Sequence, residues 1–172
     1  AYGLDELPAY ELASARTIVS FGLDFMGTAF GSMGMIKGWA RAKDPAQGGF
    51  VARTVAITPR VGLSESQADH WIAARPGSET KVALAIARLA GEARGYSGPA
   101  APLLAGIDVA AAAAASDVSE EKLREVAGWL VGGTSVVLPG GFANAGTDAT
   151  ALAAATLLVN EVLGNIGQTV VF

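Results

Sequence analysis

Short apolar runs, several of them rich in β-branched residues, recur along this chain and are mostly closed by glycine or proline. They occupy residues 16–21, 50–57, 70–74, 135–138 and 169–172. Runs of this kind between turn-forming residues predict β-strands. Segments with apolar residues at helical spacing lie between them, at 27–43, 79–93, 102–115, 119–131 and from 147 or 148 to about 163–165. Strands that alternate with helices predict the α/β class, here a three-layer α/β/α Rossmann-like domain with a mostly parallel sheet.

The composition excludes several classes of protein. Apolar residues make up 51% of the chain and charged residues 16%, which a disordered, highly charged chain would not show. The net charge is −4, so we expect no nucleic-acid partner, because such a partner needs clustered positive charge. No apolar run reaches the roughly 20 residues that a membrane-spanning helix needs, so we expect no direct membrane span.

The side chains available for metal or covalent chemistry are few. The chain has no cysteine and a single histidine, His70, so we expect no metal ligands and no disulfide within it. His70 is not accompanied by a Gly-x-Ser-x-Gly turn, and no cysteine nucleophile exists. We therefore expect no catalytic residue and no self-contained active site in this segment.

We expect residues 1–172 to form one α/β domain that is a segment of a larger subunit. The sequence begins at Ala1, without an initiator methionine or a charged-then-apolar leader. It contains no internal repeat and no low-complexity linker that would divide it. Its high apolar content suits a domain that packs against other domains or subunits.

Three loops follow predicted strands and are candidates for ligand contact. They span residues 22–28, 58–62 and 139–144. In open parallel sheets, ligands bind beyond the carboxyl ends of the strands. None of the loops carries a Gly-x-Gly-x-x-Gly or Gly-Lys-Ser/Thr signature. Two interpretations therefore stay open: tight strand-to-helix turns, or loops that contact a nucleotide or phosphate group.

The segment from Ala68 to Glu79, ADHWIAARPGSE, is more specific. It resembles the Ala-Asp-x-Trp…Arg-Pro-Gly-Thr-Asp/Glu element of the molybdopterin oxidoreductase superfamily. Two earlier segments resemble elements of the same family in order and spacing: 15–25 (ARTIVSFGLDF), and 57–60 (ITPR), which is similar to Ile-Asp-Pro-Arg. Residues 136–141 and 160–170 are similar to the molybdopterin-like subunit of bacterial alternative complex III, a membrane quinol oxidoreductase.

In catalytic members of that family, such a domain helps to bind a molybdenum bis-pterin guanine dinucleotide. The resemblance implies these cofactor-binding positions: Gly22, Asp24, Thr58, Arg60, Gly77 and Glu79. A carboxylate such as that of Glu79 can accept two N–H bonds from a guanine edge. Thr58, however, stands where the family usually has Asp, and a hydroxyl cannot replace a carboxylate as a bidentate acceptor. Glu79 is one methylene longer than the commoner Asp.

These departures favour a non-catalytic scaffold domain in a membrane-bound, quinol-oxidising electron-transfer complex. The resemblance then implies no cofactor in this segment, iron–sulfur clusters on a neighbouring domain, and contacts with other domains and subunits of the complex. It also implies a location on the periplasmic side of the bacterial inner membrane. One alternative is the bis-pterin guanine dinucleotide-binding domain of a catalytic molybdoenzyme. The other is the nucleotide-binding middle domain of a thiamine-diphosphate-type enzyme, whose strand–loop–helix layout is similar.

Overall fold

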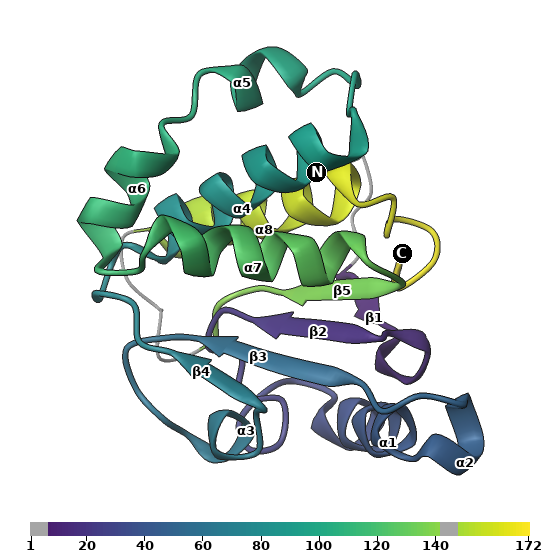
Figure 1. Ribbon diagram of the computed structural model, residues 1–172. Helices are drawn as coiled ribbons and strands as arrows, with labels where there is room; N and C mark the ends of the chain where they lie inside the picture. Colours follow the sequence, from purple (N-terminus) through teal and green to yellow (C-terminus); the bar gives the residue numbers. More distant parts are fainter. Residues whose placement is uncertain (1–6, 142–147) are drawn as a thin grey trace.

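The computed structural model describes residues 7–141 and 148–172, and a parallel sheet lies at its centre (Figure 1). The sheet contains β2 (Thr17–Ser20), β3 (Arg53–Ile57), β4 (His70–Ile72) and β5 (Ser135–Leu138). These four strands are all parallel, in the order β4-β3-β2-β5. Two short strands, β1 (Ala9–Tyr10) and β6 (Val170–Val171), form a separate antiparallel pair. The predicted α/β class and mostly parallel sheet are confirmed.

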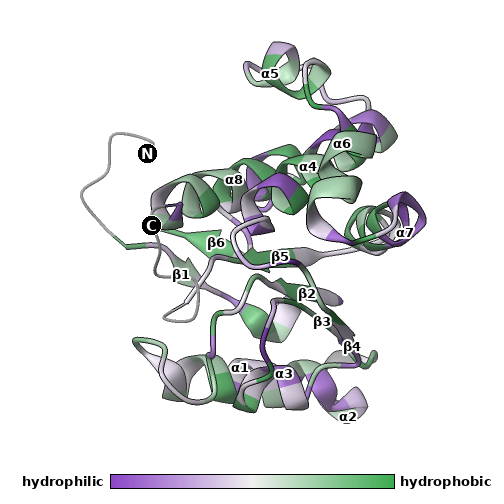
Figure 2. Ribbon diagram, turned by 90° about the vertical axis from the view of Figure 1, so that its left-hand side faces the viewer, coloured by the Kyte–Doolittle hydropathy of each residue, from purple (hydrophilic) through white to green (hydrophobic). Residues whose placement is uncertain are grey.

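Helices cover both faces of the sheet and complete three layers. They are α1 (Ser32–Lys43), α2 (Pro45–Gly48), α3 (Leu63–Ser66), α4 (Glu79–Arg94), α5 (Ala101–Ala105), α6 (Val109–Ser116), α7 (Glu120–Val131) and α8 (Ala149–Val162), with a 3₁₀ turn η1 (Leu12–Ser14). Figure 2 shows α4, α7 and α8 on one side of the sheet and α1, α2 and α3 on the other.

Alternating side chains on the strands build a core on each face of the sheet. In β2, Val19 packs among the apolar residues of α4, α7 and α8, whereas Ile18 packs on the opposite side with Phe25. In β5, Val137 belongs to the first cluster and its neighbour Val136 to the second. Successive strand side chains point to opposite faces, so a strand that is apolar throughout needs helices on both sides.

The helix predicted at 27–43 begins later than expected, at Ser32. Its N-cap, Gly31, has a left-handed backbone (φ 73°), which interrupts a regular helix at that point. The preceding residues instead form turns in which the carbonyl of Asp24 accepts the N–H groups of Gly27, Thr28 and Ala29. Glycine at 27 leaves room for the Asp24 carboxylate, which would lie 2.3 Å from an added Cβ.

The single helix predicted at 102–115 is also wrong, because the structure divides it into α5 and α6. Asp108 is the N-cap of α6, and its Oδ1 accepts the N–H of Ala111 at 3.0 Å. An aspartate in that position begins a new helix more readily than it continues an old one. Asp44 acts in the same way as the N-cap of α2, and its Oδ1 accepts the N–H of Ala46 at 2.9 Å.

A side chain from α8 completes the outer edge of the sheet. Asn160 is buried, and its amide bonds the backbone of the edge strand β5: Oδ1 accepts the N–H of Val137 at 3.0 Å, and Nδ2 donates to the Val137 carbonyl at 2.7 Å. Nδ2 also bonds the Thr156 carbonyl, and Asn165 donates to Oδ1. Asn160 therefore takes the place of a neighbouring strand at this position, where the backbone would otherwise lack partners.

Candidate functional site

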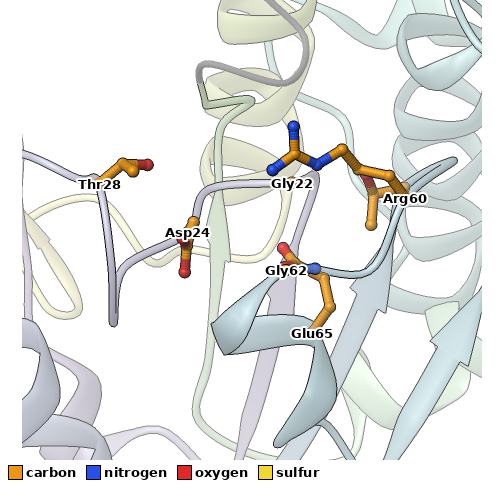
Figure 3. A pocket seen from close by; sticks show the side chains of 7 residues that line it. Gly22, Asp24, Thr28, Arg60, Gly62 and Glu65 are labelled. Carbon is orange, nitrogen blue, oxygen red and sulfur yellow. The ribbon is translucent and has the colours of Figure 1, made fainter.

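A small pocket lies where β2 and β3 end at the carboxyl edge of the sheet (Figure 3). It is lined by Gly22, Asp24, Thr28, Thr58, Arg60, Gly62 and Glu65. Four of the six positions predicted from the sequence, Gly22, Asp24, Thr58 and Arg60, therefore lie together. The pocket has a volume of about 40 Å³, enough for a few water molecules.

Both carboxylates in this pocket are bonded to the chain's own donors. Asp24 Oδ1 accepts the N–H of Ser64 at 3.2 Å and its hydroxyl at 2.7 Å, and Ser64 Oγ accepts the N–H of Met26 at 2.9 Å. Glu65 is buried, and its Oε2 accepts the N–H of Gly62 at 2.8 Å. The bonds of Asp24 and Met26 to Ser64 hold α3 against the loop after β2, and the bond of Glu65 to Gly62 stabilises the first turn of α3.

Thr58 and Arg60 have side-chain hydrogen-bonding groups without a partner among the described residues. The Thr58 backbone is bonded on both sides, since its N–H donates to Ile72 and its carbonyl accepts from Trp71 Nε1 at 3.0 Å. Its Oγ1 is buried and has no hydrogen-bond partner among the described residues. Arg60 is exposed and, within residues 7–141 and 148–172, forms no ion pair. Figure 3 shows its guanidinium extending toward the loop at Gly22.

The other two predicted positions, Gly77 and Glu79, do not line this pocket. Gly77 lies in the turn before α4 and has a φ of 79°, a left-handed conformation that suits glycine. The turn is fastened by Ser78, whose hydroxyl donates to the Arg75 carbonyl at 2.6 Å. Glu79 is the first residue of α4 and is only 5% exposed.

The charged and aromatic residues of the segment 68–79 connect the sheet to its surroundings. Asp69 Oδ2 accepts the N–H of Thr54 at 2.6 Å and pairs with Lys43. Arg75 forms a forked ion pair with Asp117 before α7. The Trp71 bond to Thr58 holds the loop after β3, whereas the Asp69 and Arg75 contacts join the segment to β3, α1 and the start of α7.

We predict that Asp69→Asn lowers the free energy of unfolding by about 1 kcal/mol at pH 7. Burial opposes ionisation of Asp69, but bonds from Lys43 and Thr54, with the charges of Lys43 and His70, together lower its pKa below the ordinary 3.8. The folded state therefore releases this proton more readily than the unfolded state. The resulting stability is present above pH 3.8 and is lost as the pH falls through the lowered pKa.

Urea unfolding of both proteins at pH 7 and at pH 3 measures this difference. The gap between wild type and Asp69→Asn should shrink at the lower pH, since below pH 3.8 the unfolded wild-type chain binds the proton that the folded state still releases. A gap that is equal at both pH values would contradict the assignment to the charge of Asp69.

The third predicted loop meets the first at Gly141. A Cβ added there would lie 2.6 Å from the Gly22 carbonyl oxygen and 3.1 Å from Leu23 Cα. The remainder of that loop, at 142–144, lies outside the described residues. No group of three histidine, cysteine, aspartate or glutamate side chains within the described residues is placed to bind a metal ion. Likewise, none of the described helices is both long and apolar enough for a membrane crossing.

Of the other lining residues, Thr28 and Gly62 lie in the predicted loops 22–28 and 58–62 but were not named individually, whereas Glu65 lies outside all three loops. The contact between Gly62 and Glu65 could have been predicted, because a glutamate at the third helical position commonly accepts a hydrogen bond from the N-cap amide. Ser64, the partner of Asp24, gave no such signal. Its contact joins residues 40 apart in the sequence.

Comparison of the sequence with protein families finds no match, and comparison with curated proteins finds none either. The fold does match solved structures. One is acetylene hydratase from Pelobacter acetylenicus, with a TM-score of 0.75 and 10% sequence identity. The match covers 96% of this chain and 24% of that chain. This chain is thus similar in fold to about a quarter of that longer protein.

Proposed function

We propose that this chain is a molybdopterin-oxidoreductase-like domain that serves as a non-catalytic scaffold in a membrane-bound, quinol-oxidising electron-transfer complex. Two lines of argument support the coarser part of the proposal. The segments around Asp24, Arg60 and Arg75 resemble that superfamily. Acetylene hydratase, whose fold the chain shares, is a molybdopterin-containing tungsten enzyme. The complex, its iron–sulfur clusters and a periplasmic location rest on the resemblance to alternative complex III.

The scaffold role is supported by the hydrogen bonds that the two acidic residues of the pocket already accept from the chain itself. A guanine base needs a carboxylate with free lone pairs directed at its N–H groups. One oxygen of each acid is already engaged, since Asp24 Oδ1 accepts hydrogen bonds from Ser64 and Glu65 Oε2 accepts one from Gly62, so neither carboxylate presents two free oxygens to a guanine edge. Thr58 has no carboxylate, and Glu79 lies outside the pocket lining. The residues present therefore do not fit the guanine end of a pterin dinucleotide, and we derive no chemical step through that group.

Metal and nucleotide analysis of the intact protein, purified with its native partners, tests this proposal. We expect neither molybdenum nor tungsten in stoichiometric amount, and no guanine nucleotide released by acid hydrolysis. Stoichiometric metal together with guanine nucleotide would overturn the scaffold role and establish the domain of a catalytic molybdoenzyme. Release of FAD or ADP instead would establish the alternative of a thiamine-diphosphate-type middle domain.

One observation favours the catalytic alternative. Among the described residues, Thr58 Oγ1 is buried without a partner, and Arg60, which lines the same pocket, forms no ion pair. A buried hydroxyl without a hydrogen bond is unfavourable by itself, so such groups often await a ligand or a water molecule. Arg60 would suit a phosphate group.

Replacement of Thr58 by valine tests which interpretation applies. In the scaffold interpretation, the change removes an unsatisfied hydroxyl and keeps the side-chain shape, so stability should rise by about 1 kcal/mol. The measurement is urea unfolding of the chain without partners. A loss of stability would instead show that Oγ1 has a partner in solution. Thr28→Val, at an exposed position, is the control and should change stability little.

A further inference from the structure

A second pocket lies at the opposite end of the sheet, beside the amino-terminal ends of β2 and β3. Arg16, Arg53, Trp129 and Gly133 contribute to its lining, and its volume is about 310 Å³. We propose that the chain binds a carboxylate group in this pocket. The proposal is independent of the pocket at Thr58 and of the function proposed above.

Arg53 is held in place by an aromatic platform. Its guanidinium carbon lies 4.5 Å from the centroid of the Trp129 ring. The same ring stacks on His70, with a centroid distance of 4.6 Å and an angle of 26° between the planes. Contacts with Arg53 and His70 thus restrain the indole, and a stacked guanidinium keeps its edge N–H groups free for a further partner.

Arg16 brings a second positive charge to the same pocket. Its guanidinium carbon lies 5.1 Å from the centroid of the Phe50 ring, and its side chain passes over Gly133, where an added Cβ would lie 3.0 Å from Arg16 Cδ. In the part of the chain that the structure describes, neither Arg16 nor Arg53 forms an ion pair. Among the described residues, none of those that line the pocket is an aspartate or a glutamate. Two guanidinium groups without a counter-charge favour an anionic ligand.

The neighbouring helix end decides which anion fits best. Helix α7 ends at Val131, so its carbonyl groups, the negative end of the helix dipole, face this region. Thr17 Oγ1 satisfies one of them, the Trp129 carbonyl, at 3.1 Å. A phosphate is favoured at helix N-termini and disfavoured here because of its larger negative charge. A planar carboxylate group suits a guanidinium edge, and in a dicarboxylate such as succinate the second charge lies on a separate group, so less negative charge faces the helix end than with phosphate.

Titration of the chain with succinate, followed by NMR, tests the proposal. We expect saturable shifts of the Trp129 indole N–H and of the Gly132 and Gly133 amides, with a dissociation constant on the order of 1 mM. Arg53→Gln should weaken binding about tenfold, and the double change with Arg16→Gln should abolish it. Arg94→Gln is the matched control, because it removes the same charge at an exposed position on α4.

A peptide probe distinguishes the two possible sources of the carboxylate, a polypeptide partner and a small organic acid. A peptide ending in two glutamates that binds about tenfold tighter than succinate would assign the ligand to a polypeptide partner. Equal or weaker peptide binding would assign it to a small organic acid. The proposal is overturned by the absence of saturable shifts with both probes, by shifts that persist in the double variant, or by phosphate that binds as tightly as succinate.

Discussion

Replacing Asn160 with alanine should lower the free energy of unfolding by about 3 kcal/mol or more. The change removes one side chain that bonds both the N–H and the carbonyl of Val137 in the edge strand β5. Both backbone groups would be left buried without a partner, and each such loss costs about 1–3 kcal/mol. The bond from Asn165 Nδ2 to Asn160 Oδ1 would also be lost.

Urea unfolding with a two-state fit measures this effect. Thr150→Ala on the exposed side of α8 is the matched control, and it should lie within about 0.5 kcal/mol of wild type. Amide exchange gives a second measurement, because the Val137 N–H should exchange much faster in the Asn160 variant. A variant with wild-type stability and slow exchange would show that water or a neighbouring group replaces the asparagine.

The sequence predicted the strands well because their signal is local. The runs that became β2 and β5 are short, rich in β-branched residues and followed by Gly22 and Pro139, so strand type and loop position follow from neighbouring residues. The helix errors were also local in origin. At Asp108, side-chain capping outweighed the helix preference of the alanines around it.

Contacts between distant residues could not be predicted in this way. The segment 160–170 was noted for its resemblance to a family, but nothing in it indicated that Asn160 would bond β5. The antiparallel pairing of Ala9–Tyr10 with Val170–Val171 joins the two ends of the chain and likewise has no local signal. Such features depend on how helices pack against the sheet, which one sequence does not encode in a readable pattern.

In the candidate site, too, some features could be predicted from the sequence, whereas others depend on contacts between distant residues. Topology alone brings together Gly22, Asp24, Thr58 and Arg60, because the carboxyl ends of neighbouring parallel strands meet at one edge. The partners of the acids were not predictable, since Ser64 reaches Asp24 only through the placement of α3. The chemistry that the pocket can perform is therefore decided by contacts rather than by the motif itself.

Replacing Gly141 with alanine should destabilise the chain by about 1–3 kcal/mol and displace the loop after β2. The new Cβ would lie 2.6 Å from the Gly22 carbonyl oxygen, 3.1 Å from Leu23 Cα and 3.4 Å from the Asp24 nitrogen. All three are backbone atoms, so a change of side-chain rotamer cannot relieve the contact. The loops after β5 and β2 must instead separate, and this separation would alter the pocket at Gly22 and Asp24.

Gly34→Ala in α1 is the matched control for this change, because an added Cβ there meets no atom within 4 Å. Alanine in a helix interior is more favourable than glycine, so Gly34→Ala should raise stability by about 0.5–1 kcal/mol. Opposite signs for the two variants in urea unfolding, with shifted amide signals at Gly22 and Asp24 only in Gly141→Ala, are the expected result. If Gly141→Ala is as stable as wild type and leaves those signals unchanged, the two loops are not in direct backbone contact in solution.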